Sequence, residues 1–202
     1  MKKLLKSSFL VGCLFGQLIS SNVFADDIRL GMPAYGGTGC PAGSASAALS
    51  FDQKSLSIIF DQFVATAGGV GGSYLSRKSC NIAIPVHVPQ GLSLSILEVD
   101  YRGYNYLPSG SMSRFDVEYF FAGIRGPRYQ KSFYGYLDSN YQIDNDLALS
   151  ALVWSRCGED VILRTNASIL ARTNAFRHET ISTVDTADFR AGIVYLLQWR
   201  SC

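Results

Sequence analysis

The sequence predicts an all-β fold: an antiparallel two-sheet sandwich of about ten strands, jelly-roll-like and stapled by disulfides. Three observations predict this fold. Apolar and polar residues alternate with a period of two along several stretches of the chain. Turn-forming residues separate these stretches at short intervals. Four cysteines remain once a predicted N-terminal leader is removed, an even number in an exported chain.

The N-terminus has the layout of a secretory signal peptide. The stretch "MKKLLKSSFLVGCLFGQLISSNVFADD" has three early lysines, an apolar part from Phe9 to Ile19, and small residues before Asp26. We expect cleavage after Ala25, which makes residues 1–25 a signal peptide and residues 26–202 a single domain. The expected location is secreted, periplasmic or at the cell surface. The stretch "LVGC" also resembles a bacterial lipobox, so a lipoprotein anchored through Cys13 is the alternative.

The predicted mature domain is close to electrically neutral. Residues 26–202 hold 15 lysines and arginines against 16 aspartates and glutamates, because the leader removes three lysines and no acids. A neutral domain lacks the positive charge that holds a nucleic-acid backbone, so we expect no nucleic-acid partner. No membrane span is expected either, because no stretch approaches the roughly 18 apolar residues that a spanning helix needs. The sequence leaves the oligomeric state open.

The strands are expected in the following order. Residues 44–53 read either as a strand or as a short helix. Residues 92–107 alternate, but the apolar phase changes near Ile96–Leu97, which predicts a β-bulge. Residues 113–121 and 160–170 alternate without interruption, and residues 192–199 are apolar on both faces, which predicts a central, covered strand. The turn signals between the strands are "TAGGVGGS", "VPQG", "LPSGS", "GIRGP", "DSN", "DND" and "CGED".

The four remaining cysteines predict two disulfides. Three pairings are possible, and we favour Cys40–Cys80 with Cys157–Cys202, because each closes a loop of about 40–45 residues without crossing the other. In the chain-entropy model each bridge stabilises the fold by about 4 kcal/mol. A zinc site is the competing interpretation, but the sequence has no Cys-x-x-Cys pair.

Each of the two tryptophans, Trp154 and Trp199, stands three residues before a cysteine of the second predicted pair. Positions i and i+3 of a strand face opposite ways, so we expect both tryptophans in the core and both cysteines at strand ends.

Several stretches together resemble a known family: "AYGGTGCPAGSAS", "FDQF", "RKSCNIAIPVHVPQG", "DYRG", "WSRCG" and the closing "LQWRSC". In order and spacing they are similar to the secreted domain of unknown function 4360 family of bacteria and fungi. The resemblance covers essentially the whole predicted mature chain and includes all four cysteines. It implies a secreted, disulfide-bonded, mostly β domain, and it implies no activity, ligand or catalytic residue.

The sequence offers little for catalysis. The chain has only two histidines, His87 and His178, and it lacks a Gly-x-Ser-x-Gly elbow, so a serine hydrolase is not expected. A glycosidase that uses Glu98 and Glu118 is the alternative enzyme, because both glutamates fall in predicted strands. Whether the protein is an enzyme stays open, and we favour a non-enzyme.

Tyrosines gather in the middle of the chain. Eight of the eleven lie between Tyr101 and Tyr141, interleaved with arginines. Flat aromatic rings beside polar groups suit stacking on sugar rings or contact with a protein, although tyrosine also simply favours strands. The candidate ligand-binding residues are Arg102, Tyr104, Tyr106, Tyr129, Tyr134 and Tyr136.

One acidic stretch, "LDSNYQIDND", suggests calcium. Asp138, Asp144 and Asp146 offer oxygen ligands, but their spacing does not match a known calcium loop, and aspartate is also an ordinary turn residue. No other cofactor is expected. The leading functional hypothesis is therefore an exported, non-enzymatic module that binds an extracellular glycan or protein. The alternatives are a secreted carbohydrate-active hydrolase and a structural envelope protein.

Overall fold

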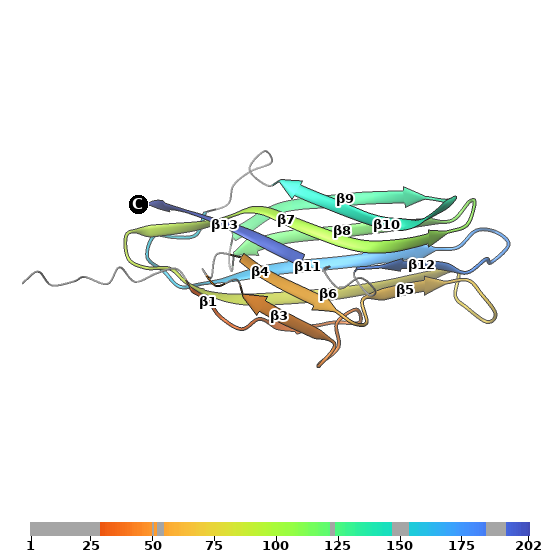
Figure 1. Ribbon diagram of the computed structural model, residues 1–202, viewed down its shortest axis with the longest axis horizontal. Coiled ribbons are helices and arrows are strands. Elements are labelled where there is room, and N and C mark those ends of the chain that lie inside the picture. Colours follow the sequence, from red (N-terminus) through yellow and green to blue (C-terminus); the bar gives the residue numbers. More distant parts are fainter. Residues whose placement is uncertain (1–28, 50, 52–54, 122–123, 147–153, 185–192) are drawn as a thin grey trace, which may run out of the picture.

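A computed structural model of the chain describes residues 29–49, 51, 55–121, 124–146, 154–184 and 193–202 (Figure 1). The predicted signal peptide and the alternative lipid-anchor residue Cys13 lie outside the described residues. The described part is all-β, as predicted, and contains thirteen strands where the sequence predicted about ten. Within it there is no helix long and apolar enough to cross a membrane.

The strands form two sheets in which every pairing is antiparallel. Sheet A has the order β1-β6-β11-β8-β9, with β2 also paired to β6; sheet B has the order β3-β4-β13-β7-β12-β5, with β10 also paired to β7. The two sheets pack face to face, which confirms the sandwich; the jelly-roll connectivity stays a prediction. The strands are β1 (Arg29–Leu30), β2 (Ala34–Gly36), β3 (Ala45–Leu49), β4 (Ser55–Phe60), β5 (Val64–Ala67), β6 (Leu75–His87), β7 (Leu92–Leu107), β8 (Met112–Phe121), β9 (Ile124–Tyr134), β10 (Leu137–Asp146), β11 (Val161–Arg172), β12 (Thr180–Thr183) and β13 (Ile193–Ser201).

The core lies between the sheets and follows the predicted alternation. All four predicted inward residues of β8 are buried, from Phe115 to Phe121 at every second position, as are Leu163 to Ile169 at every second position of β11. Two tyrosines meet across the core: the hydroxyl of Tyr101 on sheet B is hydrogen-bonded to the hydroxyl of Tyr119 on sheet A. The ring of Tyr101 also packs against Phe115, with 4.6 Å between ring centroids.

The predicted bulge in β7 is present. Along the β13–β7 ladder Leu196 pairs with Glu98 and Leu197 pairs with Ile96, so Leu97 has no partner in the ladder. One extra residue reverses the facing of all later residues, and from Val99 onward the odd-numbered positions of β7 turn to the core. β13 lies between β4 and β7, which confirms the predicted central strand.

Both predicted disulfides are present. Cys40–Cys80 is completely buried, and Cys157–Cys202 lies exposed at the end of β13. The expectation for Trp154 is wrong: this residue lies in an irregular segment, is only half-buried, and packs beneath the guanidinium of Arg200, 4.2 Å from the ring centroid. The side chain of Trp199 lies outside the described residues.

Three of the predicted turns are wrong. "GIRGP" largely belongs to β9, and "DSN" and "DND" belong to β10. β9 and β10 are the edge strands of their sheets, so polar residues on their outer faces contact solvent. In β10, Tyr141 and Ile143 alternate with these polar residues and pack toward the core. This alternation favours a strand more than the turn propensity of aspartate and asparagine opposes it.

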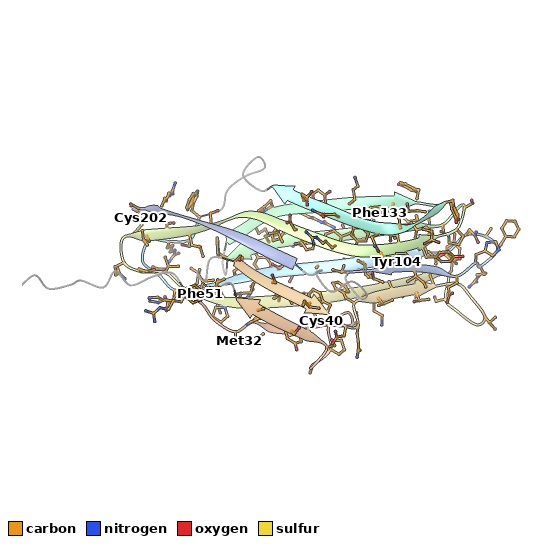
Figure 2. All side chains as sticks on the ribbon, viewed as in Figure 1. Met32, Cys40, Phe51, Tyr104, Phe133 and Cys202 are labelled. Carbon is orange, nitrogen blue, oxygen red and sulfur yellow. A yellow bond between two sulfur atoms is a disulfide. The ribbon has the colours of Figure 1, made fainter. Side chains whose placement is uncertain are left out.

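Four connections between the sheets gather at one end of the molecule, which we call the loop end. They are residues 68–74, 108–111, 135–136 and 173–179, and each joins a strand of one sheet to a strand of the other. The row of paired residues Leu75, Arg172, Met112 and Tyr134 crosses sheet A at this end. The disulfide Cys157–Cys202 lies at the opposite end of the long axis, where Figure 2 labels Cys202.

Candidate functional site

The tyrosine-rich middle of the chain forms two adjacent strands of sheet B, β7 and β10. Beyond the bulge the even-numbered residues of β7 face solvent, and β10 places Asn140 opposite Tyr104 and Asp138 opposite Tyr106. Figure 2 labels Tyr104 toward the loop end of this sheet. We call the resulting surface the tyrosine strip; its members are Arg102, Tyr104, Tyr106, Asn140, Asp138 and the turn residue Tyr136.

A hydrogen bond organises the strip. The Tyr104 hydroxyl donates to Oδ1 of Asp138 over 2.6 Å. This hydrogen bond raises the pKa of Tyr104; burial, the Asp138 charge and the nearby phenols of Tyr106 and Tyr136 raise it further. The phenol therefore stays protonated and holds the carboxylate in one orientation. Among the described residues Oδ2 of Asp138 has no hydrogen-bond partner, so it can accept from a ligand.

The backbone beneath the strip is held firmly. The amide of Tyr104 donates to Oγ1 of Thr183 over 2.9 Å, and the Tyr141 hydroxyl donates to the Thr183 carbonyl over 2.6 Å. Only glycine fits at position 103, because a Cβ there would lie 2.1 Å from the Thr183 carbonyl oxygen. β12 therefore fixes the height and direction of the rings on β7.

Two carboxylates lie next along the same face. Asp144 on β10 is paired directly with Asp100 on β7. Burial raises the pKa of Asp100, Asp144 raises it further by charge and by a hydrogen bond, and Arg102 partly offsets these effects. Like charges at directly opposed positions of a sheet destabilise the pair of strands.

The structure divides the predicted ligand-binding residues. Arg102, Tyr104, Tyr106 and Tyr136 gather on the strip. Tyr134 ends β9 on the outer face of sheet A, where it is paired with Met112. Tyr129 belongs to the inner face of β9 and packs against the core, and burial raises its pKa. The sequence could not separate these tyrosines, because all of them occur in alternating, strand-like stretches.

The alternative catalytic pair is not brought together. Glu118 lies on β8 in sheet A, on the outer face, whereas Glu98 lies on β7 in sheet B. A retaining or inverting glycosidase needs two carboxyl groups across one groove, and an outward-facing residue of sheet A does not share a groove with sheet B. The side chain of Glu98 lies outside the described residues.

Glu118 instead borders a polar hollow of about 290 Å³ on the outer face of sheet A. The buried carboxylate of Asp116 accepts from Nε of Arg114 (2.7 Å) and Nη2 of Arg128 (3.0 Å). Arg128 is paired opposite Glu118 but bonds Asp116, so no described side chain neutralises Glu118. The alternation of residues 113–121 puts Asp116 and Glu118 on the same face, but it could not show that Arg128 of the next strand reaches Asp116.

The three candidate calcium ligands do not form a cluster. Asp138 and Asp144 lie six residues apart on the straight strand β10, roughly 20 Å along it, and Asp138 is already bonded to Tyr104. The side chain of Asp146 lies outside the described residues. Among the residues that the structure describes, no group of three or more His, Cys, Asp or Glu side chains could hold a metal ion.

The histidines occupy separate places. Nδ1 of His87 lies 2.7 Å from Oδ1 of Asp160, beside a hollow of about 310 Å³. The described residues that line this hollow include no serine, threonine, cysteine or lysine, so the His–Asp pair has no nucleophile to activate there. His178 lies in the 173–179 loop, where Nδ2 of Asn174 is 3.0 Å from its Nδ1.

Comparison with known proteins places the chain in a family. The model of one family, described as "Domain of unknown function (DUF4360)", matches residues 26–202. A protein of the fungus Arthroderma benhamiae, named "Uncharacterized secreted protein", is 30% identical over 178 residues, which cover 88% of this chain and 73% of the fungal protein. The secreted relative and the two disulfides fit an oxidising, extracellular environment. This chain belongs to the DUF4360 family.

Proposed function

We propose that this protein is a non-catalytic, exported glycan-binding module and that the tyrosine strip binds a neutral saccharide chain. The observation on which the proposal depends is the outward-facing Tyr104, hydrogen-bonded to Asp138 and accompanied by Tyr106 and Tyr136. A sugar ring has a face of C–H groups and a rim of hydroxyls. It therefore needs a flat aromatic surface with donors and acceptors at its edge.

The polar members of the strip supply that edge. Asp138 and Asn140 lie beside the rings of Tyr106 and Tyr104, their partners in the ladder. A carboxylate accepts two hydroxyl hydrogen bonds and an amide both donates and accepts, which matches neighbouring hydroxyls on a sugar. From Asp100, which borders the strip, to Tyr106 this face runs roughly 20 Å along β7, which is long enough for several sugar units.

The charges of the strip select against polyanions. The carboxylate of Asp138 lies on the strip and those of Asp100 and Asp144 border it, whereas the strip's guanidinium is that of Arg102. A uronate or sulfated polysaccharide would meet net repulsion, whereas a neutral polysaccharide would not. We therefore expect binding that changes little with salt.

The test is retention on a panel of insoluble neutral polysaccharides, measured as a binding isotherm for the whole mature protein. Tyr104→Ala should weaken binding by about 10-fold or more, because it removes a central aromatic ring. Tyr104→Phe keeps the ring but frees Asp138, so its loss should be smaller.

Tyr134→Ala is the matched control, because Tyr134 is an exposed tyrosine on the outer face of the other sheet. It should bind as the wild type does. Equal losses in Tyr104→Ala and Tyr134→Ala would show that the strip is not the site. No retention of the wild type on any neutral polysaccharide would reject glycan binding and turn attention to a protein partner.

A further inference from the structure

Apolar side chains are exposed at the tips of two loops at the loop end. Val70, in the 68–74 loop, is fully exposed, and Phe176, in the 173–179 loop, is 82% exposed. Figure 1 shows both loops projecting beyond the strand ends, between β5 and β6 and between β11 and β12. Exposed apolar side chains gathered at one end of a soluble protein often mark a contact surface.

The 173–179 loop is built to hold Phe176 outward. Oδ1 of the buried Asn174 accepts from the amides of Phe176 (3.1 Å) and His178 (3.2 Å), and its Nδ2 donates to the Ser109 carbonyl (2.8 Å). Arg177 adopts a left-handed conformation, with φ of 57°, and its amide donates to the Asn174 carbonyl. A non-glycine residue in this region is unusual and marks a loop whose shape is specified.

The two loops also hold each other. The Gly69 amide donates to the Arg177 carbonyl over 2.9 Å, and Nη1 of Arg177 donates to the Gly72 carbonyl over 3.2 Å. The Arg177 guanidinium lies 5.7 Å from the ring centroid of Tyr74. A Cβ at Gly68, which has φ of 77°, would lie 2.3 Å from the His178 carbonyl oxygen. Val70 and Phe176 are therefore fixed relative to one another before any contact is made.

Several of the amides near the tips are satisfied inside the protein. Those of Gly68, Gly69 and Gly72 donate to carbonyls within the two loops, as do the amides of Phe176, Arg177 and His178 to Asn174. A backbone N–H group that already has a hydrogen-bond partner costs little free energy when it leaves water. Such groups can therefore enter a medium of low dielectric constant.

The surroundings of the tips match a lipid interface. Tyr74, Tyr134 and Tyr136 lie partly or largely exposed around them, and tyrosine rings favour the headgroup level of a bilayer. One guanidinium, on Arg177, and one carboxylate, on Glu179 beside Gly69, lie close to the tips. This pair of opposite charges is complementary to a zwitterionic headgroup of phosphate and quaternary ammonium.

We propose that the loop end docks on a phospholipid bilayer by inserting Val70 and Phe176 to the depth of the headgroups, with Tyr74, Tyr134 and Tyr136 at the interface. Projecting apolar tips suit a deformable lipid surface, because it needs no preformed hole of matching shape. The proposal does not depend on the tyrosine strip's proposed ligand, although Tyr136 borders both surfaces. A few inserted side chains give reversible binding, not permanent anchoring.

The test is flotation of the full mature protein with phosphatidylcholine vesicles at 0.1 M and 1 M salt. We expect the wild type to float at both salt concentrations, because insertion of apolar groups is not screened by salt. The double variant Val70→Ser/Phe176→Ser should lose at least about 10-fold in vesicle affinity, since it removes both inserted side chains.

Phe51→Ser is the matched control: Phe51 is fully exposed but lies in the β3–β4 connection, outside the loop end. It should float as the wild type does, and thermal unfolding should show that all variants stay folded. Phe176→Trp should show a blue-shifted emission, and quenching by brominated lipid, when vesicles are added. A wild type that does not float, an equal loss in Phe51→Ser, or unchanged flotation of the double variant would each overturn the proposal.

The two surfaces can fail separately. Tyr104→Ala should leave flotation unchanged, and the double variant should keep its retention on polysaccharide. Loss of flotation in Tyr104→Ala would overturn docking through the loop tips.

Discussion

The two disulfides differ in burial, and this difference predicts an order of reduction and of stability. Both sulfurs of Cys40–Cys80 belong to the core, whereas Cys157–Cys202 is exposed at the end of the last strand. The perturbation is removal of each bridge in turn, as Cys40→Ala/Cys80→Ala and as Cys157→Ser/Cys202→Ser.

The magnitudes follow from loop length and burial. The bridges span 40 and 45 residues, so the chain-entropy model assigns about 4 kcal/mol to each. Removing the buried pair also leaves unfilled space in the core, which adds about 1–2 kcal/mol. Removing the exposed pair opens no space in the core. The end of β13 can also fray without this bridge, which makes the loss of stability on its removal smaller. Unfolding temperatures should fall by no more than about 8–16 °C without the exposed bridge, and further without the buried one.

Thermal unfolding by calorimetry measures the loss, and alkylation with mass spectrometry measures the order of reduction. Under mild reductant, Cys157 and Cys202 should be labelled first, while Cys40 and Cys80 stay protected. Earlier labelling of Cys40 and Cys80, or a larger loss of stability from the exposed bridge, would refute the reasoning from burial.

Three further predictions concern single side chains. Asp100→Asn should stabilise the protein above pH 4. The pKa of Asp100 is raised above 3.8 in the folded state, so the wild type loses stability as the pH rises from 3.8 through the folded pKa. Urea unfolding at pH 7 should show a gain of about 0.2–1 kcal/mol in the variant. Asp138→Asn should lower the pKa of Tyr104, because the hydrogen bond to a charged carboxylate disappears, and ultraviolet titration of the phenols should show one tyrosine ionising at lower pH. Asp116→Leu should cost about 1.5–3 kcal/mol in urea unfolding, because it removes a buried carboxylate that accepts two charge-assisted hydrogen bonds and leaves two arginines together.

Each of these predictions has an outcome that contradicts it. A pH-independent difference between wild type and Asp100→Asn would mean that burial and Asp144 do not raise the pKa of Asp100. An unchanged phenol titration in Asp138→Asn would mean that the hydrogen bond to Tyr104 is not formed in solution. For Asp116→Leu, a neutral or stabilising effect would show that desolvation of the carboxylate offsets its two hydrogen bonds.

Local pattern was enough to predict much of the fold. The period-two alternation gave the inward faces of β8 and β11, and the change of phase at Ile96–Leu97 gave the bulge in β7. These features depend on residues next to each other in the chain, where the sequence carries the whole signal. Cysteine count and spacing predicted both disulfides for a similar reason, because short, uncrossed loops are closed at the least cost in entropy.

The candidate site was harder, because it depends on which strands are neighbours. The sequence singled out Tyr104 and Asp138 for different reasons, a binding surface and a metal site, and could not show that they are hydrogen-bonded. The aspartates and asparagines of β10 resembled turn residues, so a strand beside β7 was not expected. Glu98 and Glu118 showed the reverse error: both lie in strands, but in different sheets. Pairing between distant strands is decided by packing of the whole sandwich, which local pattern does not contain.

The hydrogen bond between the hydroxyls of Tyr101 and Tyr119 has a consequence for alignment. A sheet with a period of two could slide over its partner by two residues and still bury apolar side chains, so hydrophobic packing alone leaves several alignments close in free energy. Any such slide would separate the two hydroxyls and break this hydrogen bond in the core, at a cost of about 0.5–1.5 kcal/mol. This polar pair and the buried hydrogen bond from Ser113 on sheet A to Asn105 on sheet B thus favour one alignment of the two sheets over others that apolar packing alone would tolerate.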